Sequence, residues 1–134
     1  MVQPSVTVVV CSVGEAPLLG RCLGALLTAD VGAPLVISGG QSLSLLRNAA
    51  IAECRSDVIA FVDDDVAVGR DWLEALVAAW NGADDRVACI GGPIAVNVTG
   101  ERPAWLSDEV ARGYGSFTPG GEARAINAAE QTLF

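Results

Sequence analysis

Short apolar runs rich in β-branched residues alternate along this chain with segments whose apolar residues recur at helical intervals. The runs occupy 5–13, 35–37 and 58–62 (SVTVVVCSV, LVI and VIAFV), and the helical segments occupy 17–29, 41–54 and 70–80. Runs that are apolar almost throughout are typical of strands buried on both faces, as in parallel sheets. The alternation therefore predicts an α/β fold: a minimal Rossmann-like three-layer sandwich with a mainly parallel central sheet.

The pattern weakens in the last third of the chain. Residues 87–90 and 94–98 flank Gly91-Gly92-Pro93 and predict two further extended segments, and a short helix is expected around 105–112. A Gly-rich loop should follow at 113–121.

The final stretch, 123–134, fits a strand or a helix equally well. With 134 residues, the chain is expected to form one compact domain, 1–134. Within it, about 113–134 would be partly mobile or would take part in a dimer contact.

Charge and composition exclude several classes of function. Acidic residues outnumber basic ones by 16 to 8, and every basic residue is Arg. Nucleic-acid binding needs a basic stripe, so we expect no nucleic-acid partner. Because the sequence contains no His, reactions that need a His base or a His metal ligand are excluded.

The four cysteines, Cys11, Cys22, Cys54 and Cys89, form no CxxC pair. We expect reduced cysteines, mostly buried, and a cytoplasmic protein. The first apolar stretch lacks a basic leader, and no window is long and apolar enough to cross a membrane, so neither a signal peptide nor a membrane span is expected.

The most informative motif is Asp63-Asp64-Asp65, which follows the run VIAFV directly. In open α/β sheets, ligands bind beyond the carboxyl ends of the strands. Adjacent carboxylates there suit Mg²⁺, which prefers one or two carboxylates together with phosphate oxygens. The motif predicts a metal-bridged diphosphate site; a solvated acidic turn is the alternative.

Arg47-Asn48 lies within the helical segment that follows Gly39-Gly40. Backbone amides at such a helix start can face an anion. Arg47 would then reach a phosphate or the carboxylate cluster; otherwise it is an ordinary surface Arg paired with an acid.

Taken together, the segments SLLRNAAIAECRSDVIAFVDDD and FVDDDVAVGRDWLEALV resemble family 2 glycosyltransferases of the GT-A fold. SVTVVVCSVGEAPLLGRCLGALL is similar to that family's first strand, base-binding loop and first helix, and IGGPIAV and PAWL also match its habits. The resemblance spans roughly residues 5 to 110. It covers the N-terminal, nucleotide-binding half of such enzymes, in abridged form.

The resemblance implies roles for particular residues. Asp63 would approach the ribose or the metal, and Asp65 would bind Mg²⁺ or Mn²⁺ between the phosphates of a nucleotide-diphosphate sugar. Arg47 would lie near the diphosphate, so that Asp63, Asp65 and Arg47 form the catalytic set. The cofactor-binding residues would be Arg47 and Asp64, together with Ser12, Val13 and Glu15 around the base pocket.

Two departures from the family keep other functions open. Residues 36–40 run almost directly into the Arg-Asn helix, where the family usually has an acidic turn and some twenty further residues. The family's catalytic base lies in a downstream half that has no counterpart here. The alternatives to metal-dependent glycosyl transfer are therefore a degenerate binding or scaffold domain, and an enzyme of another kind, such as a cyclase or isomerase, that uses the carboxylate-lined cleft.

A homodimer is expected. Half of the residues are hydrophobic (51%), and the family's second half normally covers one side of the sheet. Without that second half, the apolar patch left exposed on the sheet would exceed what monomers usually expose. Closing it in a two-fold symmetric dimer is the commonest solution. The region after Val98 is the candidate contact, and Trp105 within it is also placed to stack on a sugar or acceptor.

Overall fold

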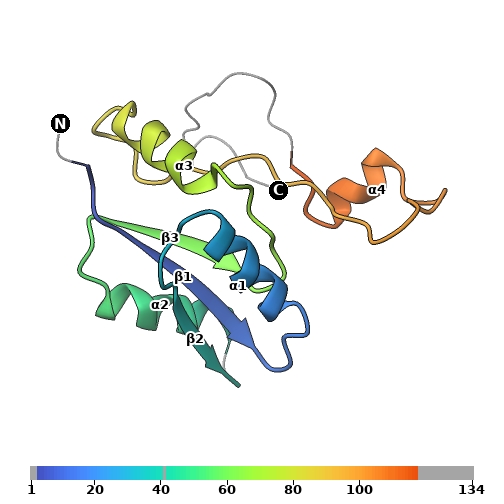
Figure 1. The fold of residues 1–134 in the computed structure, drawn as a ribbon, viewed down its shortest axis with the longest axis horizontal. Helices are drawn as coiled ribbons and strands as arrows, with labels where there is room; N and C mark the ends of the chain where they lie inside the picture. The colour runs from blue at the N-terminus through green and yellow to red at the C-terminus, as the bar shows by residue number, and fades with distance from the viewer. Residues whose placement is uncertain (1–2, 41, 118–134) are drawn as a thin grey trace. The chain divides into compact units, whose positions relative to one another are not determined.

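The structure, a computed structural model, describes residues 3–40 and 42–117. It divides into two compact units, Met1–Ala83 and Asp84–Phe134, which are described separately. Over the described residues, the first unit contains three strands and three helices, and the second contains one helix (Figure 1). In chain order the elements are β1 (Val6–Val13), α1 (Leu19–Thr28), β2 (Leu35–Gly39), α2 (Leu43–Glu53), β3 (Val58–Asp63), α3 (Trp72–Asn81) and α4 (Asp108–Gly113).

The three strands form a parallel sheet in the order β2-β1-β3. Val10 of β1, in the middle strand, is paired with Val36 on one side and Val62 on the other. All three predicted strands of this unit are present and parallel. The predicted α/β fold class is therefore confirmed.

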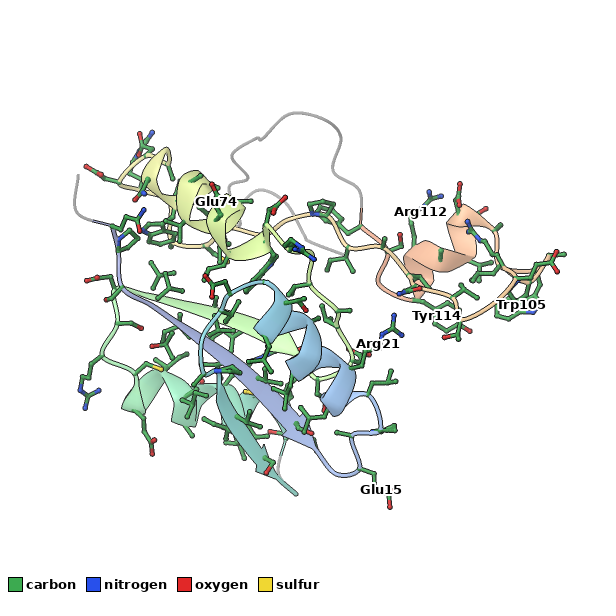
Figure 2. All side chains as sticks on the ribbon, in the orientation of Figure 1. Glu15, Arg21, Glu74, Trp105, Arg112 and Tyr114 are labelled. Atoms are coloured by element: carbon green, nitrogen blue, oxygen red, sulfur yellow. The ribbon has the colours of Figure 1, made fainter. Side chains whose placement is uncertain are left out.

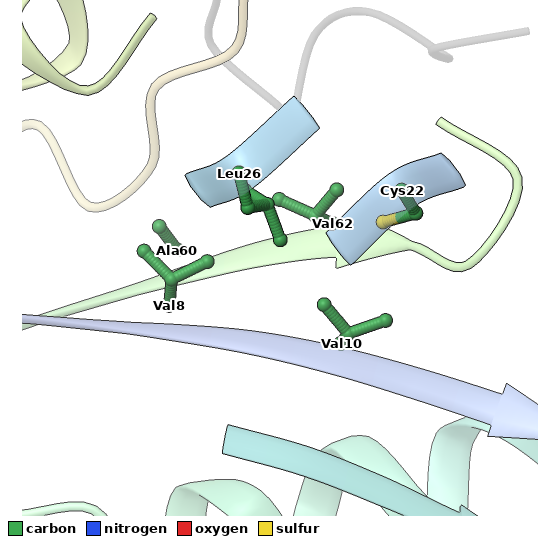
Figure 3. Packing of buried hydrophobic residues seen from close by; sticks show 6 residues of the cluster. All are labelled: Val8, Val10, Cys22, Leu26, Ala60 and Val62. Atoms are coloured by element: carbon green, nitrogen blue, oxygen red, sulfur yellow. The ribbon is translucent and has the colours of Figure 1, made fainter. Parts of the chain in front are cut away.

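One face of the sheet is covered by α1 and α3. Val8 and Val10 of β1 and Ala60 and Val62 of β3 point to this face, because alternate residues of a strand point the same way. Cys22 and Leu26 of α1 complete the buried cluster (Figure 3), and Trp72, Leu73 and Leu76 of α3 pack against it.

The opposite face is covered by α2. Val9 and Cys11 of β1 pack there against Leu46 and Ala50 of α2, so the middle strand is buried on both sides. This explains why its sequence is apolar without alternation. Helices on both faces give the expected three layers.

Two serines fix the local geometry of the first unit. Ser42 caps α2, its hydroxyl accepting a hydrogen bond from the Leu45 amide at 3.4 Å. Ser5, ahead of β1, donates from its amide and hydroxyl to one oxygen of Asp57, at 2.8 and 2.6 Å. This clamp joins the starting ends of β1 and β3 and holds the pKa of Asp57 below its ordinary value.

The second unit departs from the sequence-based expectation. Residues 87–90 were expected to form a strand and 94–98 another extended segment. Residues 87–90 form no strand, and the pairing of these two segments among the described residues is an isolated antiparallel bridge between Ile94 and Phe117. Gly91-Gly92-Pro93 interrupts the apolar run. Strand propensity alone does not form a strand unless a neighbour supplies hydrogen bonds.

The short helix expected around 105–112 is α4, which begins at Asp108. Ser107 caps it, accepting a hydrogen bond from the Val110 amide at 3.2 Å. Leu106 and Ala111 are the buried residues beside it. The Gly-rich loop predicted at 113–121 lies partly, and the unassigned stretch at 123–134 wholly, outside the described residues.

Candidate active site at the carboxyl end of the sheet

The three consecutive aspartates lie where the sequence placed them, at the carboxyl end of β3. Asp63 is the last residue of the strand, and its carbonyl accepts a hydrogen bond from the Val66 amide at 3.1 Å. This bond closes a turn with Asp64 and Asp65 at its centre. The turn presents adjacent carboxylates beyond the strand end, where ligands of α/β sheets bind.

Arg47 crosses from α2 to the same point. Its Nη2 donates to Asp63 Oδ1 at 2.7 Å, and the two side chains are 37% and 54% exposed. Arg47 is therefore not an isolated surface cation, because it joins the carboxylate cluster. One oxygen of Asp63 is engaged by this ion pair, and the other remains without a protein partner among the described residues.

Two buried cysteines line the inner side of the site. The Cys22 thiol donates to the Asp63 carbonyl at 3.5 Å and so ties the turn to α1. Burial first, and then the charges of Asp64, Asp65 and Asp63, raise the pKa of Cys22. Burial also raises the pKa of Cys11, and this exceeds the opposing effect of Arg47. Both are therefore neutral thiols near pH 7, and all four cysteines of the chain are free.

The end of β1 lies one strand away from the aspartates, and Cys11 is paired in register with Asp63. Of the residues expected to line a base pocket, Ser12 is only 2% exposed. Val13 and Glu15 are exposed around the turn at Gly14, whose φ of +73° is accessible chiefly to glycine. Figure 2 shows the Glu15 side chain pointing away from the sheet. Val13 and Glu15 are accessible to a ligand, whereas Ser12 contributes mainly backbone.

The donor atoms at this site fit a hard divalent cation that is shared with a ligand. Within residues 3–40 and 42–117, no group of three or more His, Cys, Asp or Glu side chains is arranged to hold a metal alone. A cation bound by one or two carboxylates and completed by phosphate oxygens does not need such a group. Asp65 and the second oxygen of Asp63 supply carboxylate donors of that kind.

One residue of the site was missed by the sequence-based reasoning. Phe61 lies two residues before Asp63 on the same face of β3, and the Arg47 guanidinium carbon is 6.0 Å from its ring centroid. The missed signal was period-two spacing: in a strand that ends at Asp63, residue 61 shares its face.

Candidate residues of the second unit have simpler roles. Asp108 and Glu109 occupy the first turn of α4, where acids are favourable, and Asp108 is paired with Arg102 at 2.8 Å. Trp105 is 64% exposed, and Figure 2 shows it and Tyr114 extending outward from this unit. None of the described helices is both long and apolar enough to cross a membrane.

Comparisons with known proteins agree with this architecture. The model of the family described as Glycosyl transferase family 2 matches residues 35–127, which is more than half of the chain. Two relatives, each named Pre-mycofactocin glycosyltransferase and coming from two strains of Mycobacterium tuberculosis, are 40% identical over 57 residues. That segment is 42% of this chain and only 12% of each relative, so the matched segment is a small part of those proteins. No solved structure matches significantly.

Proposed function

Because this chain belongs to glycosyltransferase family 2, we propose that its first unit binds the nucleotide-diphosphate sugar of a metal-dependent glycosyl transfer. The observation that carries the proposal is the ion pair between Arg47 and Asp63, which places a cation beside three carboxylates at the end of β3. A diphosphate bridged by a metal needs this mixture of positive and negative groups.

Each residue of the site has a part in this proposal. Asp65 and the free oxygen of Asp63 would hold Mg²⁺ or Mn²⁺, and Asp64 would border the nucleotide. When bound, the cation would supply positive charge to the leaving diphosphate. Arg47 would donate further hydrogen bonds to the phosphates, since a guanidinium carries five N–H groups.

The base and ribose would lie beyond the end of β1. Val13 and Glu15 would border them with exposed side chains, and Ser12 with its backbone. The structure thus supports a binding site along two neighbouring strand ends. The family's acidic turn after the second strand has no counterpart, because β2 ends at Gly39 and α2 begins at Leu43.

That short connection favours a second candidate, a domain that binds nucleotide without transferring sugar, or one recruited to a cyclisation or isomerisation. Turnover of a nucleotide-diphosphate sugar separates the two, since a binding domain would release no nucleoside diphosphate. In either case we propose a homodimer in the cytoplasm, a setting that suits four free thiols.

Isothermal calorimetry with UDP and with GDP, with and without Mn²⁺, tests the proposal. Wild-type protein should bind one of them in a metal-linked manner. Asp65→Ala should weaken binding by roughly 10- to 100-fold, as expected when a bond to a charged group is lost. Asp85→Ala, at an exposed acid remote in sequence, is the matched control and should leave binding unchanged. No metal-linked binding by the wild type at millimolar ligand would overturn the proposal.

A further inference from the structure

Phe61 is unusually open for its position in the fold. It lies inside β3 between Ala60 and Val62, which are almost fully buried, yet its own side chain is 37% exposed. Among the described residues, α2 packs mainly on β1 and β2, and Ile59 is the residue of β3 that packs against the same cluster. This leaves Phe61 partly open on that face. Phe61 therefore contributes less to the buried core than its neighbours do.

Arg47 of α2 reaches across this face of β3. Arg47 lies over the Phe61 ring, with 6.0 Å between the guanidinium carbon and the ring centroid, and donates to Asp63 at 2.7 Å. Phe61, Arg47 and Asp63 thus form a continuous group, which we call the Phe61–Arg47–Asp63 row. The guanidinium is held by a ring on one side and by a carboxylate on another.

We infer that Phe61 is a positioning residue of the nucleotide site, which holds Arg47 and through it orients Asp63. The predicted effect of Phe61 on nucleotide binding rests on the proposed function. The contact between Phe61 and Arg47 does not, because it is present in the protein without ligand. A cation over an aromatic face is attracted by the ring electrons, and at an exposed site this corresponds to about 2- to 5-fold in a binding constant.

The planar shape of the guanidinium explains why a ring is useful here. The guanidinium carbon lies over the Phe61 ring, and the bond to Asp63 uses one of the five N–H donors. The remaining donors stay available for diphosphate oxygens. The second oxygen of Asp63 meanwhile stays available for the cation. A Lys at position 47 would keep the charge but lose the fork of donors.

A set of substitutions at Phe61 and Arg47 separates positioning from packing. Phe61→Leu keeps an apolar side chain without a ring face and should weaken Mn²⁺-linked nucleotide binding by about 2- to 5-fold. Phe61→Trp should restore it, because Trp gives the strongest cation–π contact. In an Arg47→Met background, which has no cation to place over the ring, the loss of affinity caused by Phe61→Leu should shrink or disappear, since coupled residues are non-additive.

The readout without ligand is the mobility of the Arg47 side chain. Nitrogen-15 relaxation of its Nε–H group should show lower order in Phe61→Leu than in wild type, and recovered order in Phe61→Trp. Leu45→Ala, another exposed apolar change on α2, is the matched control and should alter neither Arg47 order nor nucleotide affinity. Urea unfolding of each variant confirms that the compared proteins are folded.

Several results would overturn the inference. Unchanged Arg47 order in Phe61→Leu would do so even if nucleotide binding were never observed, so this test is independent of the proposed function. An equal loss of affinity from Phe61→Leu in the wild-type and Arg47→Met backgrounds would assign Phe61 a packing role instead. If the wild type binds no nucleotide while Arg47 order falls in Phe61→Leu, the positioning geometry stands and the proposed function fails.

Discussion

In the first unit, Met1–Ala83, three strands pair in parallel and two separate clusters of side chains are buried against helices. In the second unit, Asp84–Phe134, the described residues form one six-residue helix and a single two-residue bridge. Both units contain apolar, β-branched runs, so composition does not explain the contrast. The difference lies in partners: an apolar run forms a strand where a neighbouring strand supplies hydrogen bonds, and β1 is buried because it has a strand on each side and helices on both faces.

Self-association gives the prediction with the largest expected effect, because a second copy of the chain would bury exposed apolar side chains of the second unit such as that of Trp105. A homodimer with micromolar Kd corresponds to about 8 kcal/mol. Trp105→Ser, which removes a 64% exposed ring, should weaken it at least about tenfold, as expected for an interface aromatic.

Sedimentation at micromolar concentration measures the association state of the wild type and of Trp105→Ser. Leu27→Ser is the matched control, since Leu27 is similarly exposed on α1 of the first unit and should not affect association. A 13.7 kDa monomer across the concentration series would show that the protein does not dimerise.

Shortening a buried side chain in each unit should give the next largest difference, measured in unfolding free energy. Leu26→Ala removes a fully buried side chain from the cluster between α1 and the sheet and should cost about 2–5 kcal/mol of unfolding free energy. Leu106→Ala should cost clearly less, because Leu106 lines a partly solvent-open pocket of about 160 Å³ and so has fewer packed neighbours. Urea titration followed by circular dichroism gives both values, and equal costs would contradict the contrast.

Two matching helix caps allow a finer comparison. Ser42 caps α2 and Ser107 caps α4 through hydroxyls that accept one amide hydrogen bond each. Ser42→Ala should lower the unfolding free energy by about 1 kcal/mol, since α2 covers the sheet. Ser107→Ala should raise amide hydrogen exchange within α4 and leave the main transition in place. A shift of that transition by Ser107→Ala would show that the two units unfold together.

The smallest expected effect concerns acid stability. The pKa values of Asp57 and Asp84 are both lowered, chiefly by a hydrogen bond from Ser5 for the first and from Arg86 for the second. A carboxyl whose folded pKa is lowered stabilises the fold fully above its unfolded pKa of 3.8, and this stabilisation is lost as pH falls through the folded value.

The two acids differ in what they connect. Asp57 joins residues 52 apart in the sequence, whereas Asp84 bonds a residue two positions away. Asp57→Asn should therefore flatten the fall in stability below about pH 4. Asp84→Asn should flatten that fall less, because a bond to a residue two positions away persists partly in the unfolded chain. Thermal unfolding from pH 2 to 6 measures both, and an identical response of the two variants would remove the distinction.

The sequence predicted the first unit well because its strands are buried on both faces and leave an uninterrupted apolar signal. The strand that leads into Asp63 followed directly from that signal. The strand expected at 87–90 is absent, since local propensity carries no information about whether a partner strand is present. Residues 118–134 lie outside the described part of the chain.

The candidate site was only partly predictable for a similar reason. Spacing placed the three aspartates at a strand end, and a helix with Arg47 nearby, so their meeting was foreseeable. The role of Phe61 depends on how far α2 extends across the sheet, which is a property of the tertiary structure. The roles of Asp63, Asp65 and Arg47 in binding stay predictions.

The central position of β1 has a consequence for how the protein is made. Its two neighbours follow it in the chain, and the clamp from Ser5 to Asp57 spans 52 residues. At translation speeds of about 5–20 residues per second, the ribosome releases β1 roughly 3 to 10 seconds before β3. During that interval VTVVVCSV is an uncharged, β-branched segment without its partners, the kind of sequence that aggregates. We expect newly synthesised chains to depend on chaperones that bind this segment until β3 emerges.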